Sequence, residues 1–238
     1  MSSKLAPMRF VRAMRFARIV ASNDLQVYLA GIKPRVRYLE LAWCNPLDIR
    51  LSTRFFVSKH GGFLHSGSEL SIDLLKENRN RFIAPGDWDQ ATTPIADVKH
   101  ISRTVAHFEK GLDWQATGEV SWMMENIAQF GVQDGCRSFE DVTARCEAID
   151  KLKSLAERDG RLLSRRDLNP GNFREKGGIG ISLSRTGELI WFSDGAHRLA
   201  IARLLRLEEI PVCLHMIHAE AALTGAWQEN IYFEPRYP

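Results

Sequence analysis

The stretch between residues 179 and 217 limits the possible folds of this chain more than any other. Two short apolar runs, 179–183 and 188–192, flank a polar loop that contains a glycine, which is the pattern of a β-hairpin. A helical pattern with one apolar face follows from 196 to 207, and an apolar run from 210 to 217 indicates a buried strand. The sequence therefore predicts a compact unit of hairpin, helix and strand.

The turn between the hairpin and this helix predicts an anion-binding site. Asp194 and Gly195 end the second strand, and His197 and Arg198 stand in the first helical turn. The free N–H groups of such a turn and the helix dipole favour negative charge. Gly195 leaves the backbone accessible to a ligand, and the two basic residues add donors. An ordinary turn before a solvated helix start is the alternative, but the neighbouring strand and helix patterns favour a phosphate.

The order of these elements resembles the nucleotide-binding core of the ParB/sulfiredoxin superfamily. The match covers the chain beyond Cys136, and it is strongest at the Gly-x-x-Arg-type turn and at the strand entered through Ile210-Pro211-Val212. The resemblance implies an α/β (α+β) protein, in which a helical N-terminal region precedes a C-terminal core with a small mixed sheet. It also implies a nucleotide, ATP or CTP, with Mg²⁺, and a phosphate-binding turn made of Gly195, Ala196, His197 and Arg198.

Two departures narrow the choice within the superfamily. Sulfiredoxins have their catalytic cysteine at the position of Ala196, so sulfinic acid repair is not expected. Partition proteins continue into a helix-turn-helix region, for which residues 219–238 leave no room, and this argues against operator binding. The branch that remains is similar to the SerK-type free-serine kinases. In kinases of this superfamily one acid acts as base toward the acceptor hydroxyl, and the acid of the turn helps with the metal.

Four acids are candidates for catalytic roles in such a kinase. The resemblance assigns Asp194 to the metal and to catalysis. Glu175 precedes the first hairpin strand, where an acid would face the turn, although an ordinary loop carboxylate fits equally well. Asp87 and Asp89 flank Trp88 after a Pro-Gly turn, an arrangement that suits Mg²⁺ or a substrate hydroxyl. The alternative there is a loop that the tryptophan anchors to the core and whose acids are solvated.

These features predict an ATP-dependent phosphotransferase, a kinase, that acts on a small hydroxyl acceptor such as a sugar or a glycan or lipid carrier. The Pro-Gly-Asp-Trp-Asp block combined with the Asp-Gly-x-His-Arg block resembles uncharacterised sequences associated with polysaccharide and glycosylation functions. The alternative is a nucleotide-gated binding protein of ParB type, in which CTP or ATP regulates a partner or nucleic acid without phosphate transfer. A net charge of only +3 argues against nucleic acid as the partner.

The N-terminal segment is the one place where charge is organised. Residues 8–20 alternate arginines with apolar residues, so they predict a basic amphipathic helix that lies on an anionic membrane surface or packs on the protein. No apolar run is long enough to span a bilayer, and four cysteines without metal or redox spacing suggest reduced thiols. A cytoplasmic protein is expected, with peripheral contact at the inner membrane surface as an option.

The remaining patterns predict three helices before the hairpin and a division into three parts. The helices are Thr93–Lys110, with Thr93 as N-cap and Pro94 as first helical residue, Gly118–Phe130, and Ser138–Gly160, which starts with a capping box. Trp114 and Trp122 are expected in the core, and His60 and His65 as solvated loop residues or a metal pair. The parts are a basic segment (1–22), a mainly helical region with the Pro-Gly-Asp-Trp-Asp loop (23–135), and the nucleotide-binding core (136–238).

Overall fold

The computed structural model describes residues 5–32, 36–53, 56–57, 63–64 and 81–236. Its centre is a seven-stranded sheet in the order β1-β9-β7-β8-β2-β6, with β5 paired to the end of β9. The strands of this sheet are β1 (Leu41–Cys44), β2 (Leu51–Thr53), β5 (Ile83–Ala84), β6 (Thr92–Pro94), β7 (Ile179–Leu183), β8 (Leu189–Ser193) and β9 (Ile210–His218). Two further strands, β3 (Phe56–Val57) and β4 (Phe63–Leu64), form a separate antiparallel pair.

The sheet is mixed, as the sequence predicts. β7 and β8 form the expected antiparallel hairpin, whereas β9 runs parallel to β7 and antiparallel to β1. β2 continues the sheet parallel to β8 and antiparallel to β6. Helix α7 (Ala196–Leu204) leads from β8 to β9. The combination of helices with a mixed sheet confirms the α/β fold class.

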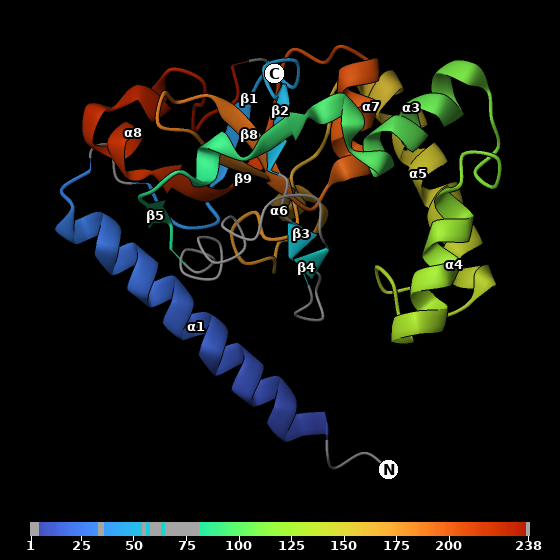
Figure 1. Cartoon of the computed structure of the whole chain (residues 1–238), viewed down its shortest axis with the longest axis horizontal. Coiled ribbons are helices and arrows are strands. Elements are labelled where there is room, and N and C mark those ends of the chain that lie inside the picture. The colour runs from blue at the N-terminus through green and yellow to red at the C-terminus, as the bar shows by residue number, and fades with distance from the viewer. Residues whose placement is uncertain (1–4, 33–35, 54–55, 58–62, 65–80, 237–238) are drawn as a thin grey trace.

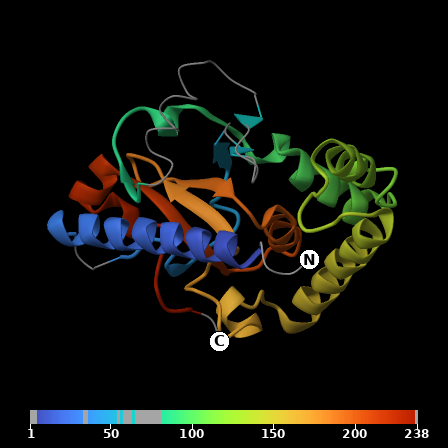
Figure 2. The same ribbon diagram turned by 90° about the horizontal axis from the view of Figure 1, so that it is seen from below.

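Helices lie at both ends of this sheet and across one side of it. α3 (Lys99–Lys110), α4 (Glu119–Phe130) and α5 (Phe139–Asp159) gather with α7 at one end of the molecule, and α8 (Ala219–Thr224) lies at the other (Figure 1). α1 (Leu5–Leu29) lies across one side of the sheet (Figure 2), where Asn23 accepts a hydrogen bond from the Phe82 amide. α6 (Arg165–Leu168) is a single turn before β7. The predicted basic helix is therefore part of α1, whose C-terminal half packs on the protein.

The predictions for the three helices before the hairpin are confirmed in two cases and wrong in part in the third. α4 begins after Gly118, and Ser138 caps α5 by accepting a hydrogen bond from the Asp141 amide at 3.2 Å. The segment from Thr93, however, is not helical until Lys99, because residues 92–94 form β6 and 95–97 a 3₁₀ turn. Proline is tolerated here because β6 is an edge strand, and pairing with β2 outweighs the local capping signals.

The sheet combines strands from both sides of the boundary expected at residues 135 and 136. β1, β2, β5 and β6 precede this boundary, and β7, β8 and β9 follow it. One large cluster of buried residues likewise joins the two parts, with Ala42 and Ile101 on one side and Ile181 and Leu199 on the other. The boundary expected at residue 22 falls inside α1.

The described residues also bear on the predictions for the tryptophans, the cysteines and a membrane-spanning helix. Trp114 is buried in the core and Trp122 packs against it, as expected. The four cysteines are free thiols in buried positions. Among the described helices, none has both the length and the apolarity needed to cross a membrane. His60 and His65 lie outside the described residues.

Candidate functional site

The turn from β8 into α7 is tight and depends on glycine. Asp194 and Gly195 have φ values of 51° and 67°, both in the left-handed region. A Cβ added to Gly195 would lie 2.8 Å from the Cα of Ile179 in β7, so that no larger residue fits. The Asp194 carbonyl accepts a hydrogen bond from the Trp191 indole at 2.9 Å, while Asp194 itself is exposed. Gly195 is the N-cap of α7 and has no side chain to satisfy the amides of the first turn.

Arg198, expected to hold phosphates, points into the protein. It is only 6% exposed and donates a hydrogen bond to the carbonyl of Leu163. Its Nε atom is buried without a hydrogen-bond partner. Burial and the neighbouring guanidinium of Arg165 lower the pKa of Arg198 to about 10, and the Glu175 carboxylate acts in the opposite direction. The guanidinium is therefore an incompletely satisfied cation behind the turn.

Glu175 lies at the same end of the sheet, as predicted, but it is fully buried. Both of its carboxylate oxygens accept hydrogen bonds from the Arg165 amide, at 2.8 and 2.9 Å, at the start of α6. Burial raises the pKa of Glu175 although several donors and cations oppose this. Its observed contacts hold α6 in place.

His197 belongs to a cluster that no pattern in the sequence predicts. Its Nε2 atom lies 3.2 Å from Oε1 of Glu119, and Nδ1 of His100 lies 2.8 Å from the same oxygen. Arg103 donates a hydrogen bond from Nη1 to Oε2 of Glu119 at 3.2 Å. The four side chains come from the first turns of α4 and α7 and from α3. We refer to His100, Glu119 and His197 as the His–Glu–His cluster.

The carboxylate at the centre of this cluster is almost completely enclosed. The side chain of Glu119 is 1% exposed, and those of His100 and His197 are 21% and 10% exposed. Burial alone would raise the pKa of Glu119, but hydrogen bonds and charge interactions with the two histidines outweigh it and hold the pKa well below its usual range. The Trp122 ring meets His100 edge-on at 4.5 Å between centroids. The arrangement stabilises an ionised carboxylate inside the protein.

The ligand-type atoms of the His–Glu–His cluster all lie within 4.8 Å of one another. Two imidazoles and one carboxylate are a ligand set that binds divalent transition metals, and they also suit acid–base chemistry. The three residues come from separate segments without a recognisable spacing. Only His197 stood in a motif, so the sequence offered no signal for the other two.

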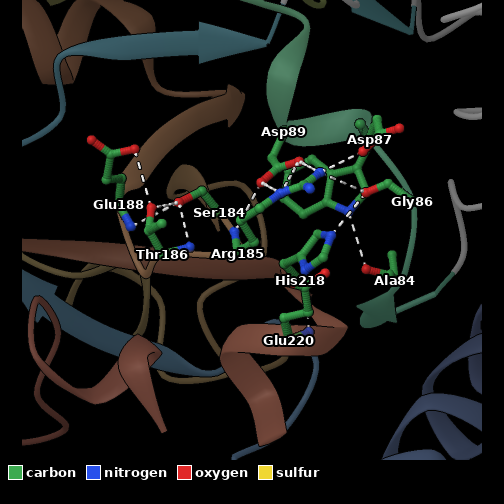
Figure 3. Close-up of polar contacts among 11 residues, drawn as sticks. Ala84, Gly86, Asp87, Asp89, Ser184, Arg185, Thr186, Glu188, His218 and Glu220 are labelled. Carbon is green, nitrogen blue, oxygen red and sulfur yellow. Dashed lines mark hydrogen bonds and ion pairs between the residues drawn. The ribbon is translucent and has the colours of Figure 1, made fainter. Parts of the chain in front are cut away.

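The Pro-Gly-Asp-Trp-Asp loop lies at the opposite end of the hairpin from the turn. Asp89 accepts hydrogen bonds from the backbone and side-chain nitrogens of Arg185, at 2.9 and 3.0 Å, and Asp87 accepts one from the same guanidinium at 2.7 Å (Figure 3). Arg185 stands in the loop between β7 and β8, whereas Asp194 follows the other end of β8. A five-residue strand spans roughly 16 Å. The structure therefore does not bring Asp87 and Asp89 to the turn.

The contacts of this loop fit a structural anchor in most respects. Trp88 is 1% exposed and donates a hydrogen bond to the Ala84 carbonyl at 3.1 Å. His218 donates from Nε2 to the Gly86 carbonyl at 2.8 Å, and its Nδ1 accepts from the Glu220 amide at 3.1 Å (Figure 3). The acids differ, since the Asp87 side chain is 75% exposed and that of Asp89 is 1% exposed. The expectation of two solvated acids is therefore wrong for Asp89.

His215 of β9 is a further titratable group near the turn. Its Nε2 atom is buried without a hydrogen-bond partner, and its ring lies 5.3 Å from that of Phe192. Burial lowers the pKa of His215 to about 4, although the charge of Asp194 acts to raise it. A neutral imidazole is therefore enclosed beside the exposed acid of the turn.

No protein-family model, curated protein or solved structure matches this chain. The likeness to the ParB/sulfiredoxin superfamily stays a prediction from the motif of the turn. Proposals for the function depend on the geometry of the turn and of the His–Glu–His cluster.

Proposed function

We propose that this protein is a nucleotide-dependent phosphotransferase that acts on a small hydroxyl acceptor, with the nucleotide phosphates at the turn between β8 and α7. The observation that supports this most is the backbone of the turn. Two residues in the left-handed region join the strand directly to the helix, and the N-cap has no side chain. The partial positive charge of the helix start is thereby available to an anion.

The residues of the turn fit a phosphate group with two changes of role, because the His197 side chain contacts Glu119 and the Arg198 side chain is buried. Gly195 and the first-turn amides of α7 would hold phosphate oxygens, and the exposed Asp194 would hold Mg²⁺ bound to them. Arg198 would act from behind the turn and would not contact the phosphates, because its guanidinium is buried against the Leu163 carbonyl. The charge of this guanidinium, whose Nε has no hydrogen-bond partner, adds positive potential behind the turn. Mg²⁺ neutralises charge on the phosphates during transfer.

The acid that approaches the acceptor hydroxyl also differs from the one expected from the sequence. Asp87 and Asp89 are bound by Arg185 at the far end of the hairpin, and Glu175 is fully buried. Asp194 is the acid of the turn that is exposed, so we assign it both to the metal and to the approach of the acceptor. Phosphoryl transfer depends mainly on the positioning of the reactants and on stabilisation of the phosphate charge. One exposed acid with Mg²⁺ is therefore sufficient for the proposed reaction.

The proposal is tested by measuring nucleotide binding and phosphate transfer in Asp194→Asn beside Asp87→Asn. Both changes remove one carboxylate from an exposed aspartate, but only Asp194 belongs to the turn. Calorimetry with Mg²⁺–ATP and Mg²⁺–CTP, followed by transfer of labelled γ-phosphate to sugars, polyols and free serine, should show loss of transfer for Asp194→Asn alone. Absence of binding of either nucleotide to the wild type, or full transfer by Asp194→Asn, would contradict the proposal.

The burial of Glu175 favours a second candidate, a nucleotide-gated binding protein. Because Glu175 is not accessible as a second acid at the turn, the nucleotide would be bound and slowly hydrolysed, and its occupancy would change a partner surface. In this case hydrolysis is the same with and without acceptors. A phosphotransferase instead shows turnover that rises with the concentration of the correct hydroxyl compound.

A further inference from the structure

The His–Glu–His cluster brings together three side chains of metal-ligand type from parts of the chain that are far apart. Glu119 and His197 are separated by 78 positions, yet Nε2 of His197 and Nδ1 of His100 approach the same carboxylate oxygen. We propose that His100, Glu119 and His197 bind a divalent transition-metal ion. This site goes beyond the proposed phosphotransferase, because it is separate from the Mg²⁺ that would accompany a nucleotide.

The distances in the cluster are close to those of a metal site. Ligand atoms about 2.1 Å from a tetrahedral ion are roughly 3.4 Å from one another. The two imidazole nitrogens lie 2.8 and 3.2 Å from Oε1 of Glu119, and all three atoms lie within 4.8 Å of one another. Small rotations of the three side chains would open the space for an ion. The hydrogen bonds now present would then be replaced by metal–ligand bonds.

This exchange requires the ring protons to leave the two nitrogens that face Glu119. The nitrogens that face Glu119 now donate protons to a carboxylate, because the ionised carboxylate only accepts. When a metal binds, each ring places its proton on the other nitrogen, Nε2 of His100 or Nδ1 of His197. The two nitrogens that face Glu119 then offer lone pairs to the ion, and Glu119 remains ionised.

The ligand types favour a transition metal over Mg²⁺. Magnesium prefers an octahedron of oxygen atoms, whereas imidazole suits zinc, iron and related ions. Two histidines with one glutamate are a known ligand set of catalytic zinc, and two histidines with one carboxylate occur in non-haem iron sites. In both types the protein leaves at least one coordination position open.

Arg103 has a supporting role in this arrangement. It binds Oε2 of Glu119 and so leaves Oε1 directed at the two histidines. Contacts of this kind orient a ligating carboxylate. A dication and a guanidinium against one carboxylate leave the site positively charged. An anion such as hydroxide or phosphate is therefore the expected occupant of the open position.

The test uses the full chain after removal of metals with a chelator and without any nucleotide. Calorimetry with Zn²⁺ should show one tight site, and Co²⁺ should give visible absorption typical of imidazole coordination. His100→Gln and Glu119→Gln should each weaken Zn²⁺ binding at least about tenfold, since even outer contacts of metal sites change affinity by that factor. Metal binding is measured here independently of nucleotide binding, so failure of one does not imply failure of the other.

The matched control is His107→Gln, a change of another histidine on α3. His107 contacts Asp150 at 3.0 Å and stacks on Trp114, outside the cluster. This variant should retain the wild-type affinity for Zn²⁺. A wild type without a stoichiometric Zn²⁺ site would overturn the proposal even if a variant fails to fold. Equal weakening by His107→Gln and Glu119→Gln would also overturn it, and the cluster would then be a hydrogen-bond network only.

Discussion

Asp89 and Glu119 are two buried carboxylates at opposite ends of the hairpin, and they differ in their donors. Each has a side chain that is 1% exposed, and in each the donors hold the pKa below its usual value despite burial. Asp89 is bound by the backbone and the guanidinium of Arg185, a group that stays protonated. Glu119 is bound by two imidazoles from different helices in addition to Arg103.

This difference separates a structural contact from one that is capable of chemistry. An arginine bound to a carboxylate has fixed charge and fixed geometry, so it holds two segments together. An imidazole can exchange its proton between two nitrogens, gain a charge or bind a metal. Burial of an acid is thus a poor guide to function by itself, and the identity of its donors is more informative.

The largest expected effect comes from breaking the contact at the hairpin. Asp89→Ala leaves the Arg185 amide and guanidinium without this acceptor, so we expect a loss of about 3 kcal/mol in the free energy of unfolding, measured with urea. Asp87→Ala is the control, because that side chain is 75% exposed and should have little effect. Equal destabilisation by the two changes would show that Asp89 is not a structural anchor.

Acidification should reduce the stability of the two ends of the hairpin at different pH values. The folded pKa of His215, about 4, lies below the usual value near 6.5, so the unfolded state binds a proton first. Stability then falls by about 2.5 kcal/mol as the pH decreases from roughly 6.5 to 4, and this loss levels off below the folded pKa. The lowered pKa of Asp89 gives a contribution that is complete above roughly pH 4 and is lost only at lower pH.

Hydrogen exchange across this pH range measures the difference. Amides of β8 and β9 near His215 should lose protection between pH 6.5 and 4, relative to a His215→Leu variant. Those of the hairpin loop should stay protected. The reverse order, or the same loss in His215→Leu, would disprove this account.

The smallest effect on stability is expected at the His–Glu–His cluster without metal. Glu119→Gln keeps an oxygen that accepts from the imidazoles but removes the charge that Arg103 binds, so a loss of about 1 kcal/mol is expected in urea unfolding. His100→Gln should cost no more, because that side chain is 21% exposed. A cost for Glu119→Gln as large as that of Asp89→Ala would remove the distinction between the two carboxylates.

The sequence predicted those parts of the fold whose signals are local. Two short apolar runs on either side of the loop with Gly187 defined the hairpin, and Ser138 with Asp141 marked the start of α5. The helix expected from Thr93 was wrong in its first part, because pairing of β6 with β2 depends on residues about 40 positions earlier. Local propensity has no information about such a partner.

The candidate site was predictable only where it forms a continuous motif. The turn at Asp194 and Gly195 was recognised from a strand, a glycine and a helix in succession. The contacts of Glu119 with His197 and of Asp89 with Arg185 link positions 78 and 96 residues apart. No periodicity connects such positions in a single sequence. The inward direction of Arg198 could not be predicted either, because it depends on the Leu163 carbonyl that receives it.

The position of β9 between β1 and β7 has a consequence for biosynthesis. It is the last of the described strands. β1 and β5 are made long before their partner β9, and β2 is made long before its partner β8. The early strands therefore leave the ribosome with unpaired edges, which is the condition under which nascent chains aggregate or recruit chaperones. Because most of the sheet is closed by pairings between distant residues, its completion is slow and takes place only after residue 218 has been synthesised.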